Sequence, residues 1–142
     1  MSNRYLPYIV GLTFRNDKDK EVPYLMPQPN NNLDFIVDTS LYISDNVTSD
    51  NKFVYFTAYS AETEDPVYLN QQFINLDGFH GTAFIRFKVS ISNKYLVNLT
   101  AIKIQLSLID KSQSAKDNPA ILDNQQFFST IIPVVTKGEP NV

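Results

Sequence analysis

The sequence of 142 residues contains no cysteine, no tryptophan, one histidine and only four glycines. Without cysteine the chain cannot form a disulfide, a thiolate metal site or a cysteine nucleophile. A loop that cradles phosphate needs a glycine-rich turn between a strand and a helix, and none of the four glycines stands in such a turn. These absences argue against redox chemistry and against nucleotide-dependent catalysis.

Catalytic residues of other kinds are also scarce. The only histidine, His80, stands in a turn between Phe79 and Gly81, and no serine or aspartate near it has the spacing of a catalytic triad. A glycosidase takes its two carboxylates from separate strands, but a chain this short without tryptophan makes a poor sugar-cleaving cleft. We therefore expect no enzyme activity and no cofactor.

Acidic residues cluster in two polar segments and raise the question of calcium, which prefers several oxygen ligands. None of these residues has the spacing of a calcium-binding loop, so solvated turns are the expectation and no metal site is predicted. The residues concerned are Asp45, Asp50, Glu62, Glu64 and Asp65.

Charge and hydropathy limit the partners. The formal net charge is -3, and the twelve basic residues are scattered singly from Arg4 to Lys137, so no stripe predicts nucleic-acid binding. No segment approaches the roughly 18 apolar residues of a membrane helix, and the N-terminus lacks the apolar region of a signal peptide. We expect a soluble, unprocessed, cytoplasmic product, with association to a virion as the alternative.

The clearest pattern in the chain is the alternation of apolar and polar side chains in residues 83–91, which predicts a strand with one dry and one wet face. Phe84 is the one exception, because it falls on the wet face. The dry positions are Ala83, Ile85, Phe87, Val89 and Ile91, and the wet ones are Arg86, Lys88 and Ser90.

Similar alternation predicts strands in residues 6–14, 33–44 and 101–108. A weaker strand is predicted in 67–76, and the last strand in 125–135. Pro7 predicts that the first strand lies at a sheet edge, and Pro133 predicts an edge or a bulge in the last strand. We expect residues 83–91 to form a central strand that pairs with 101–108. In that case Arg86, Lys88 and Lys103 would form a small basic patch.

Residues 53–59 differ, since both alternating sets are apolar: Phe53, Tyr55 and Tyr59 on one side, Val54, Phe56 and Ala58 on the other. Such a strand is either covered by a loop on its second face or contributes to an interface. The sequence leaves both interpretations open and favours the covering loop.

Strands separated by turn signals, with no sustained helical period, predict an all-β fold: one antiparallel β-sandwich, immunoglobulin-like or C2-like, of about seven to eight strands. A jelly roll or a small barrel would show a similar pattern. Residues 1–142 are expected to form one domain, in which 1–32 supply an edge strand and a Pro- and Asn-rich connection and 137–142 a frayed tail.

The function that this composition favours is a non-enzymatic protein-interaction or assembly module, such as a small subunit of a virion or surface assembly that binds a protein partner or a second copy of itself. The candidate contact residues are Ile36, Tyr42, Val54, Phe56 and Tyr59. The alternative is a sandwich that binds carbohydrate or another small ligand through exposed tyrosine rings. The absence of tryptophan counts against that alternative.

Overall fold

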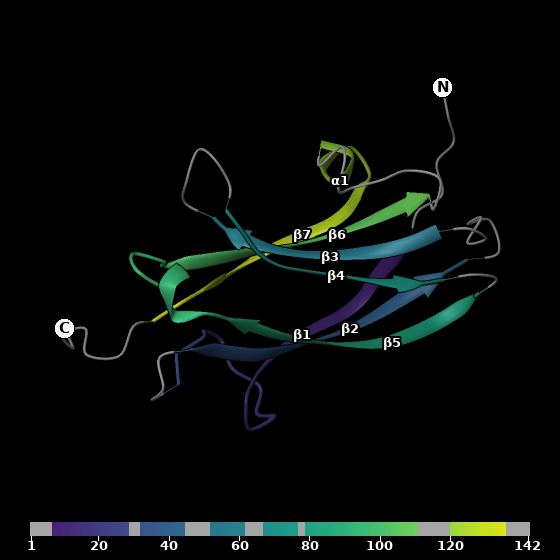
Figure 1. Cartoon of the computed structure of the whole chain (residues 1–142). Coiled ribbons are helices and arrows are strands. Elements are labelled where there is room, and N and C mark those ends of the chain that lie inside the picture. The colour runs from purple at the N-terminus through teal and green to yellow at the C-terminus, as the bar shows by residue number, and fades with distance from the viewer. Residues whose placement is uncertain are drawn as a thin grey trace.

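The computed structural model describes residues 7–28, 32–44, 52–61, 67–76, 79–110 and 120–135. These residues form two sheets that stack one above the other (Figure 1). The elements in chain order are β1 (Tyr8–Asn16), β2 (Leu33–Ile43), β3 (Lys52–Ser60), β4 (Tyr68–Asn75), β5 (Gly81–Ile91), a 3-10 turn η1 (Asn93–Tyr95), β6 (Ala101–Asp110), a short helix α1 (Ala120–Asn124) and β7 (Gln126–Pro133).

The sheet topology confirms the predicted fold class. One sheet has the strand order β1-β2-β5, the other has the order β4-β3-β6-β7, and every pair of neighbours is antiparallel. With the strands lettered A, B, C, C′, E, F and G along the chain, the sheets are ABE and C′CFG. This is the strand arrangement of an immunoglobulin-like sandwich whose fourth strand joins the second sheet.

The alternation of buried and exposed side chains along the strands places one face of each sheet in the core. On β2 the odd positions from Leu33 to Ile43 are buried, while on β5 the last three dry positions are at most 2% exposed. The Phe56 ring of β3 stacks on the Phe87 ring of β5 with centroids 4.4 Å apart, so this pair joins the two sheets at their centre. Burial of apolar surface from both sheets drives their packing.

The predicted pairing of residues 83–91 with 101–108 is wrong. β5 pairs with β2 and lies at the edge of the three-stranded sheet, whereas β6 lies between β3 and β7. Alternation identifies the buried face of a strand but not its neighbour, and the connection through η1 carries the chain from one sheet to the other. The basic patch therefore does not form: Lys103 is in the second sheet, with its Nζ atom 5.5 Å from the centre of the Tyr59 ring.

The first strand lies at a sheet edge, as Pro7 predicts, and the last strand takes the edge position among the two alternatives that Pro133 leaves open. Within β1 the even positions Leu12 and Phe14 pack against the core, as the alternation predicts, but the pattern fails nearer the start of the strand. A β-bulge between Ile9 and Gly11 shifts the register, so that Ile9 packs toward the core while Tyr8 and Val10 are 66% and 65% exposed. An inserted residue of this kind reverses the alternation on either side of it.

Strand β3 is apolar on both faces; its inner face is buried and its outer face is partly covered. Val54, Phe56 and Ala58 are fully buried between the sheets. On the outer side Tyr55 packs with Ile109 and with Leu122 of α1. The helical turn α1 thus supplies part of the cover that the sequence predicts from a loop.

The connection after β1 ties the two sheets together. Leu25 is buried and forms a parallel bridge with Val134, with hydrogen bonds from Leu25 N to Pro133 O and from Val135 N to Leu25 O. The side chain of Gln28 bonds to both backbone groups of Asp34 and so continues the ladder at the start of β2. The expected tail at 137–142 lies outside the described residues.

Candidate functional site

The outer face of the β1-β2-β5 sheet carries a group of exposed aromatic side chains, which we call the aromatic patch: Tyr8, Tyr42 and Phe84. Their exposed fractions are 66%, 44% and 80%. Tyr8 of β1 pairs directly with Tyr42 of β2, and Tyr42 in turn pairs with Thr82 of β5. Phe84 is therefore the diagonal neighbour of Tyr42, close enough for large rings to touch a common ligand.

Small neighbours leave the Phe84 ring uncovered. Phe84 pairs with Ser40, and Ser40 pairs on its other side with Gly11. A Cβ atom placed at Gly11 would meet nothing within 4 Å. The row Gly11, Ser40 and Phe84 thus holds one large ring beside two residues too small to shield it.

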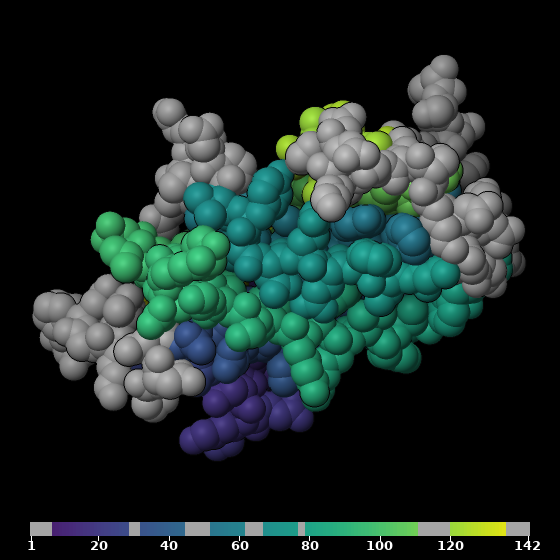
Figure 2. All heavy atoms as spheres, in the orientation of Figure 1, coloured from purple at the N-terminus to yellow at the C-terminus, as the bar shows by residue number. Residues whose placement is uncertain are grey.

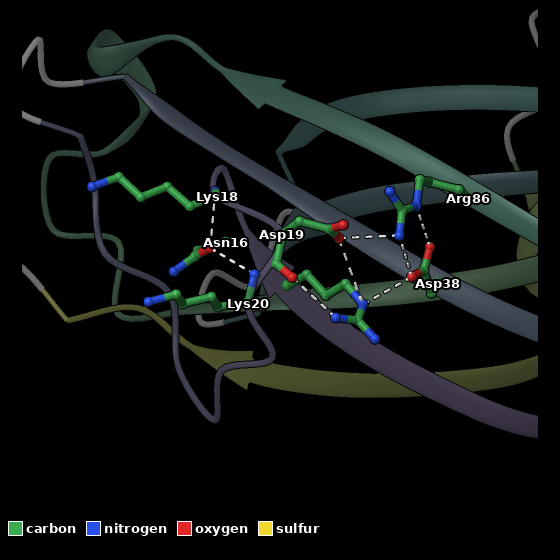
Figure 3. Close-up of polar contacts among 7 residues, drawn as sticks. Asn16, Lys18, Asp19, Lys20, Asp38 and Arg86 are labelled. Atoms are coloured by element: carbon green, nitrogen blue, oxygen red, sulfur yellow. Dashed lines mark hydrogen bonds and ion pairs between the residues drawn. The ribbon is translucent and has the colours of Figure 1, made fainter.

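Four charged side chains, Arg15, Asp19, Asp38 and Arg86, form what we call the ionic cluster, which adjoins the aromatic patch in the strand register. Figure 3 shows the side chains of Asp19, Asp38 and Arg86 directed toward one another. Asp38 of β2 is its centre: it accepts hydrogen bonds from Arg86 Nε at 2.8 Å, Arg86 Nη2 at 2.9 Å and Arg15 Nε at 2.9 Å. Asp19, in the turn after β1, accepts from Arg86 Nη2 at 3.1 Å. Two arginines and two aspartates make the cluster electrically neutral.

The ionic cluster stabilises the turn that follows β1. Hydrogen bonding to Arg86 is the main influence that lowers the pKa of Asp38, and the same contact raises the pKa of Arg86. The Arg15 guanidinium also donates from Nη1 to the backbone oxygen of Asp19 at 3.0 Å, and Asp19 has a left-handed backbone with a φ of 65°. These contacts fold the turn back over the sheet and satisfy the charges internally, which leaves little capacity to hold an anion.

The five residues predicted as contact residues are not brought together. Ile36 and Tyr42 lie on the outer face of the β1-β2-β5 sheet, half-buried and exposed respectively. Val54 and Phe56 are fully buried in the core, so neither has surface to offer a partner. Tyr59 is buried on the outer side of the other sheet, where its hydroxyl donates to Gln105 Oε1 at 2.7 Å.

Sequence analysis missed Tyr8 and Phe84 as members of the aromatic patch. Phe84 had a signal, because it is the single apolar side chain on the wet face of a regular strand. Tyr8 had a weaker signal, because Pro7 and Gly11 flank the bulge that turns it outward but do not fix where the extra residue lies. The exposed fractions of Tyr8 and Phe84 and the strand pairing place both rings in the aromatic patch.

Two further concave regions adjoin the described strands. A groove of about 390 Å³ continues the outer face beyond the ionic cluster, between Ile36 and Lys88. A second, of about 320 Å³, lies at one end of the sandwich and is lined by Tyr95, Asn98 and Ser60 among others.

The candidates for catalysis and metal binding form no site in the described part of the chain. His80 is exposed, and its Nδ1 atom lies 3.3 Å from the backbone oxygen of Ser44. Within the residues that the structure describes, no three histidine or acidic side chains meet in a way that could hold a metal ion. All five acidic residues weighed for calcium lie outside the described ranges.

Comparisons with known proteins give a likeness of shape alone. No family model matches the chain, and no curated protein matches its sequence. Among solved structures, the crystal structure of an immunoglobulin-like protein from Pseudomonas aeruginosa is similar, with a TM-score of 0.42 and 9% sequence identity over 94% of this chain and 100% of that one. Neither helix in the described ranges has the length and apolarity to cross a membrane.

Proposed function

We propose that this chain is a non-enzymatic protein-interaction module whose contact surface is the outer face of the β1-β2-β5 sheet. The observation that carries the proposal is the aromatic patch, above all the Phe84 ring, of which 80% is exposed to solvent. Burying a ring of this size is worth about 1.5 to 3 kcal/mol, and tyrosine and phenylalanine are enriched where proteins meet.

The position of the patch supports an interaction role. Its three residues stand on three neighbouring strands of one sheet, so the backbone holds the rings in fixed relative positions. A rigid aromatic surface loses little conformational entropy when it binds. Such a module fits a small subunit of a larger assembly, for example a virion or a surface complex. A cytoplasmic location accords with a chain without cysteine.

The proposal can be tested with a photoreactive residue, p-benzoylphenylalanine, placed singly at Tyr42, Phe84 or Ile131. Ile131 is the matched control: it is 58% exposed but lies on the other sheet. Irradiation in an extract of the producing organism should yield a discrete protein adduct at Tyr42 and Phe84 and none at Ile131. Equal labelling at the three positions, or none above background, would refute the aromatic patch as a contact surface.

Carbohydrate binding is the second candidate, and one observation favours it. The groove of about 320 Å³ combines the half-exposed ring of Tyr95 with an amide from Asn98, and it is large enough for one sugar ring. A glycan array should then show a hit that Tyr95→Ala abolishes and Tyr42→Ala does not. An array without any hit would remove this candidate.

A further inference from the structure

Strand β5, which lies on the face of the molecule that Figure 2 shows, has one backbone edge that pairs with no other strand of the described residues. Among the described residues it pairs with β2 alone, over eleven positions without a register shift. The other edge strands are interrupted: β1 by its bulge, β7 by a shift in its pairing with β6 and by the Leu25 bridge, and β4 by a shift in its pairing with β3. A long, regular edge of this kind is a template for another strand.

One hydrogen bond shows which backbone N–H and C=O groups of β5 point away from β2. Gln72 Nε2 of β4 donates to the backbone oxygen of Lys88 at 2.8 Å, so the Lys88 carbonyl points away from β2. Backbone direction alternates along a strand, so Thr82, Phe84 and Arg86 also direct their N–H and C=O groups outward. Beneath this edge Ala83 and Ile85 face the core but are only half-buried, so the sandwich is open along the same segment.

The open segment has defined limits. Toward the C-terminus, the Lys88 carbonyl already accepts a hydrogen bond from the Gln72 side chain, which limits its capacity to pair with another strand. Toward the N-terminus, Gly81 has a left-handed backbone with a φ of 98°, which ends the extended geometry. Between these limits lie the outward-directed residues Thr82, Phe84 and Arg86, and Phe84 is at their centre.

We infer that two copies of this chain pair through β5, antiparallel, across a two-fold axis at Phe84. The inference rests on the proposed function, since it names a second copy as the partner of Phe84, the most exposed member of the aromatic patch. In this register Phe84 faces Phe84 of the second copy, and Thr82 faces Arg86 on either side. Each of the three pairs exchanges two backbone hydrogen bonds, six in all, and the two exposed phenylalanine rings cover one another.

Charge also favours this register. The Arg86 side chain is already neutralised by Asp38 and Asp19, and it meets an uncharged Thr82 across the axis. A register centred on Arg86 would set two arginines opposite each other and would need the carbonyl of Lys88, which Gln72 occupies. A two-fold contact requires a surface that is complementary to itself, and the segment from Thr82 to Arg86 satisfies that condition.

A cysteine crosslink tests both the pairing and its register, because the chain has no native cysteine. Directly opposite residues in a hydrogen-bonded pair have Cα atoms about 5.5 Å apart, within disulfide range. Phe84→Cys should therefore give a covalent dimer on mild oxidation. Thr82→Cys is the matched control, since its two copies would be about 14 Å apart, four residues along the strand. A mixture of Thr82→Cys and Arg86→Cys should crosslink.

The uncrosslinked protein supplies the second measurement, the solution mass by light scattering over a range of concentrations. The native chain should reach the mass of a dimer, and Phe84→Lys should raise the dissociation constant by about tenfold or more. Ile131→Lys, an exposed site on the other sheet, should leave the constant unchanged. Circular dichroism checks that both variants fold.

The inference is overturned by a native chain that stays monomeric, by a dimer that Phe84→Lys does not weaken, or by crosslinking that is as fast at Thr82 as at Phe84. These failures differ from failure of the proposed function. If self-pairing fails while photoreactive residues at Tyr42 and Phe84 still label a different protein, the surface binds a heterologous partner. If labelling also fails, the interaction role itself is wrong.

Discussion

Among the five residues that the sequence predicts as contact residues, replacement by alanine should destabilise the fold strongly at a core position such as Phe56 and weakly at a surface position such as Tyr42. The Phe56 ring is fully buried and stacks on Phe87 of the opposite sheet at 4.4 Å, with an interplanar angle of 23°. Removing a buried phenylalanine ring deletes this contact and leaves a cavity between the sheets, at a cost of about 3 to 5 kcal/mol. The same change at Tyr42, which is 44% exposed, should cost about 0.5 kcal/mol or less in stability.

The free energy of unfolding can be measured by urea titration. The chain has no tryptophan but eight tyrosines, so far-ultraviolet circular dichroism and tyrosine fluorescence are the suitable signals. For a protein of about this size each kcal/mol lowers the melting temperature by roughly 2 to 4 °C, so Phe56→Ala should melt about 6 to 20 °C below the native chain. Phe56→Leu, which keeps most of the volume, should lose much less. A loss below about 1 kcal/mol for Phe56→Ala would refute the placement of this ring between the sheets.

Two further predictions concern polar contacts. Asp38→Asn should lower stability by about 1 kcal/mol or less at neutral pH, because the Asp38 side chain is 28% exposed and solvent screens its ion pairs. Since its pKa is lowered in the folded chain, the stabilisation is present above the ordinary value of 3.8 and is lost as the pH falls below it. The difference between native and variant should therefore vanish in acid, and a difference that grows in acid would contradict the sign. Gln105→Leu should cost about 1 to 3 kcal/mol, because it leaves the buried Tyr59 hydroxyl without its acceptor. Adding Tyr59→Phe should restore part of the loss, and strict additivity in this double-mutant cycle would show that the two side chains do not interact.

The faces of the strands could be predicted from the sequence, but their neighbours could not. Alternation placed Phe87, Val89 and Ile91 correctly in the core, since a period of two fixes which side chains share a face. The same pattern says nothing about which strand lies alongside. β5 and β6 follow each other in the chain and are both strongly alternating, yet they belong to different sheets, because the connection through η1 crosses the sandwich.

The candidate site was predictable in part for a related reason. Tyr42 was identified as a contact residue because it breaks the wet face of its strand. Phe84 breaks the wet face of β5 in the same way. Tyr8 followed an unbroken alternation, and only the bulge at Ile9 and Gly11 turns its ring outward. Val54 and Phe56 could not be separated from surface aromatics, because a strand covered on both faces has the same composition as one that forms an interface.

The ionic cluster and the open edge of β5 share Arg86, and this link explains how a charged residue can lie in a strand that accepts a partner. Charged side chains on an edge strand usually discourage pairing. Here Asp38 and Asp19 draw the Arg86 guanidinium back over the outer face of the sheet and neutralise it. The backbone of Arg86 is left in the edge while its charge is directed away from an incoming strand. If this is the role of the cluster, Asp38→Asn should weaken self-pairing through β5 even where it barely changes the stability of the single chain.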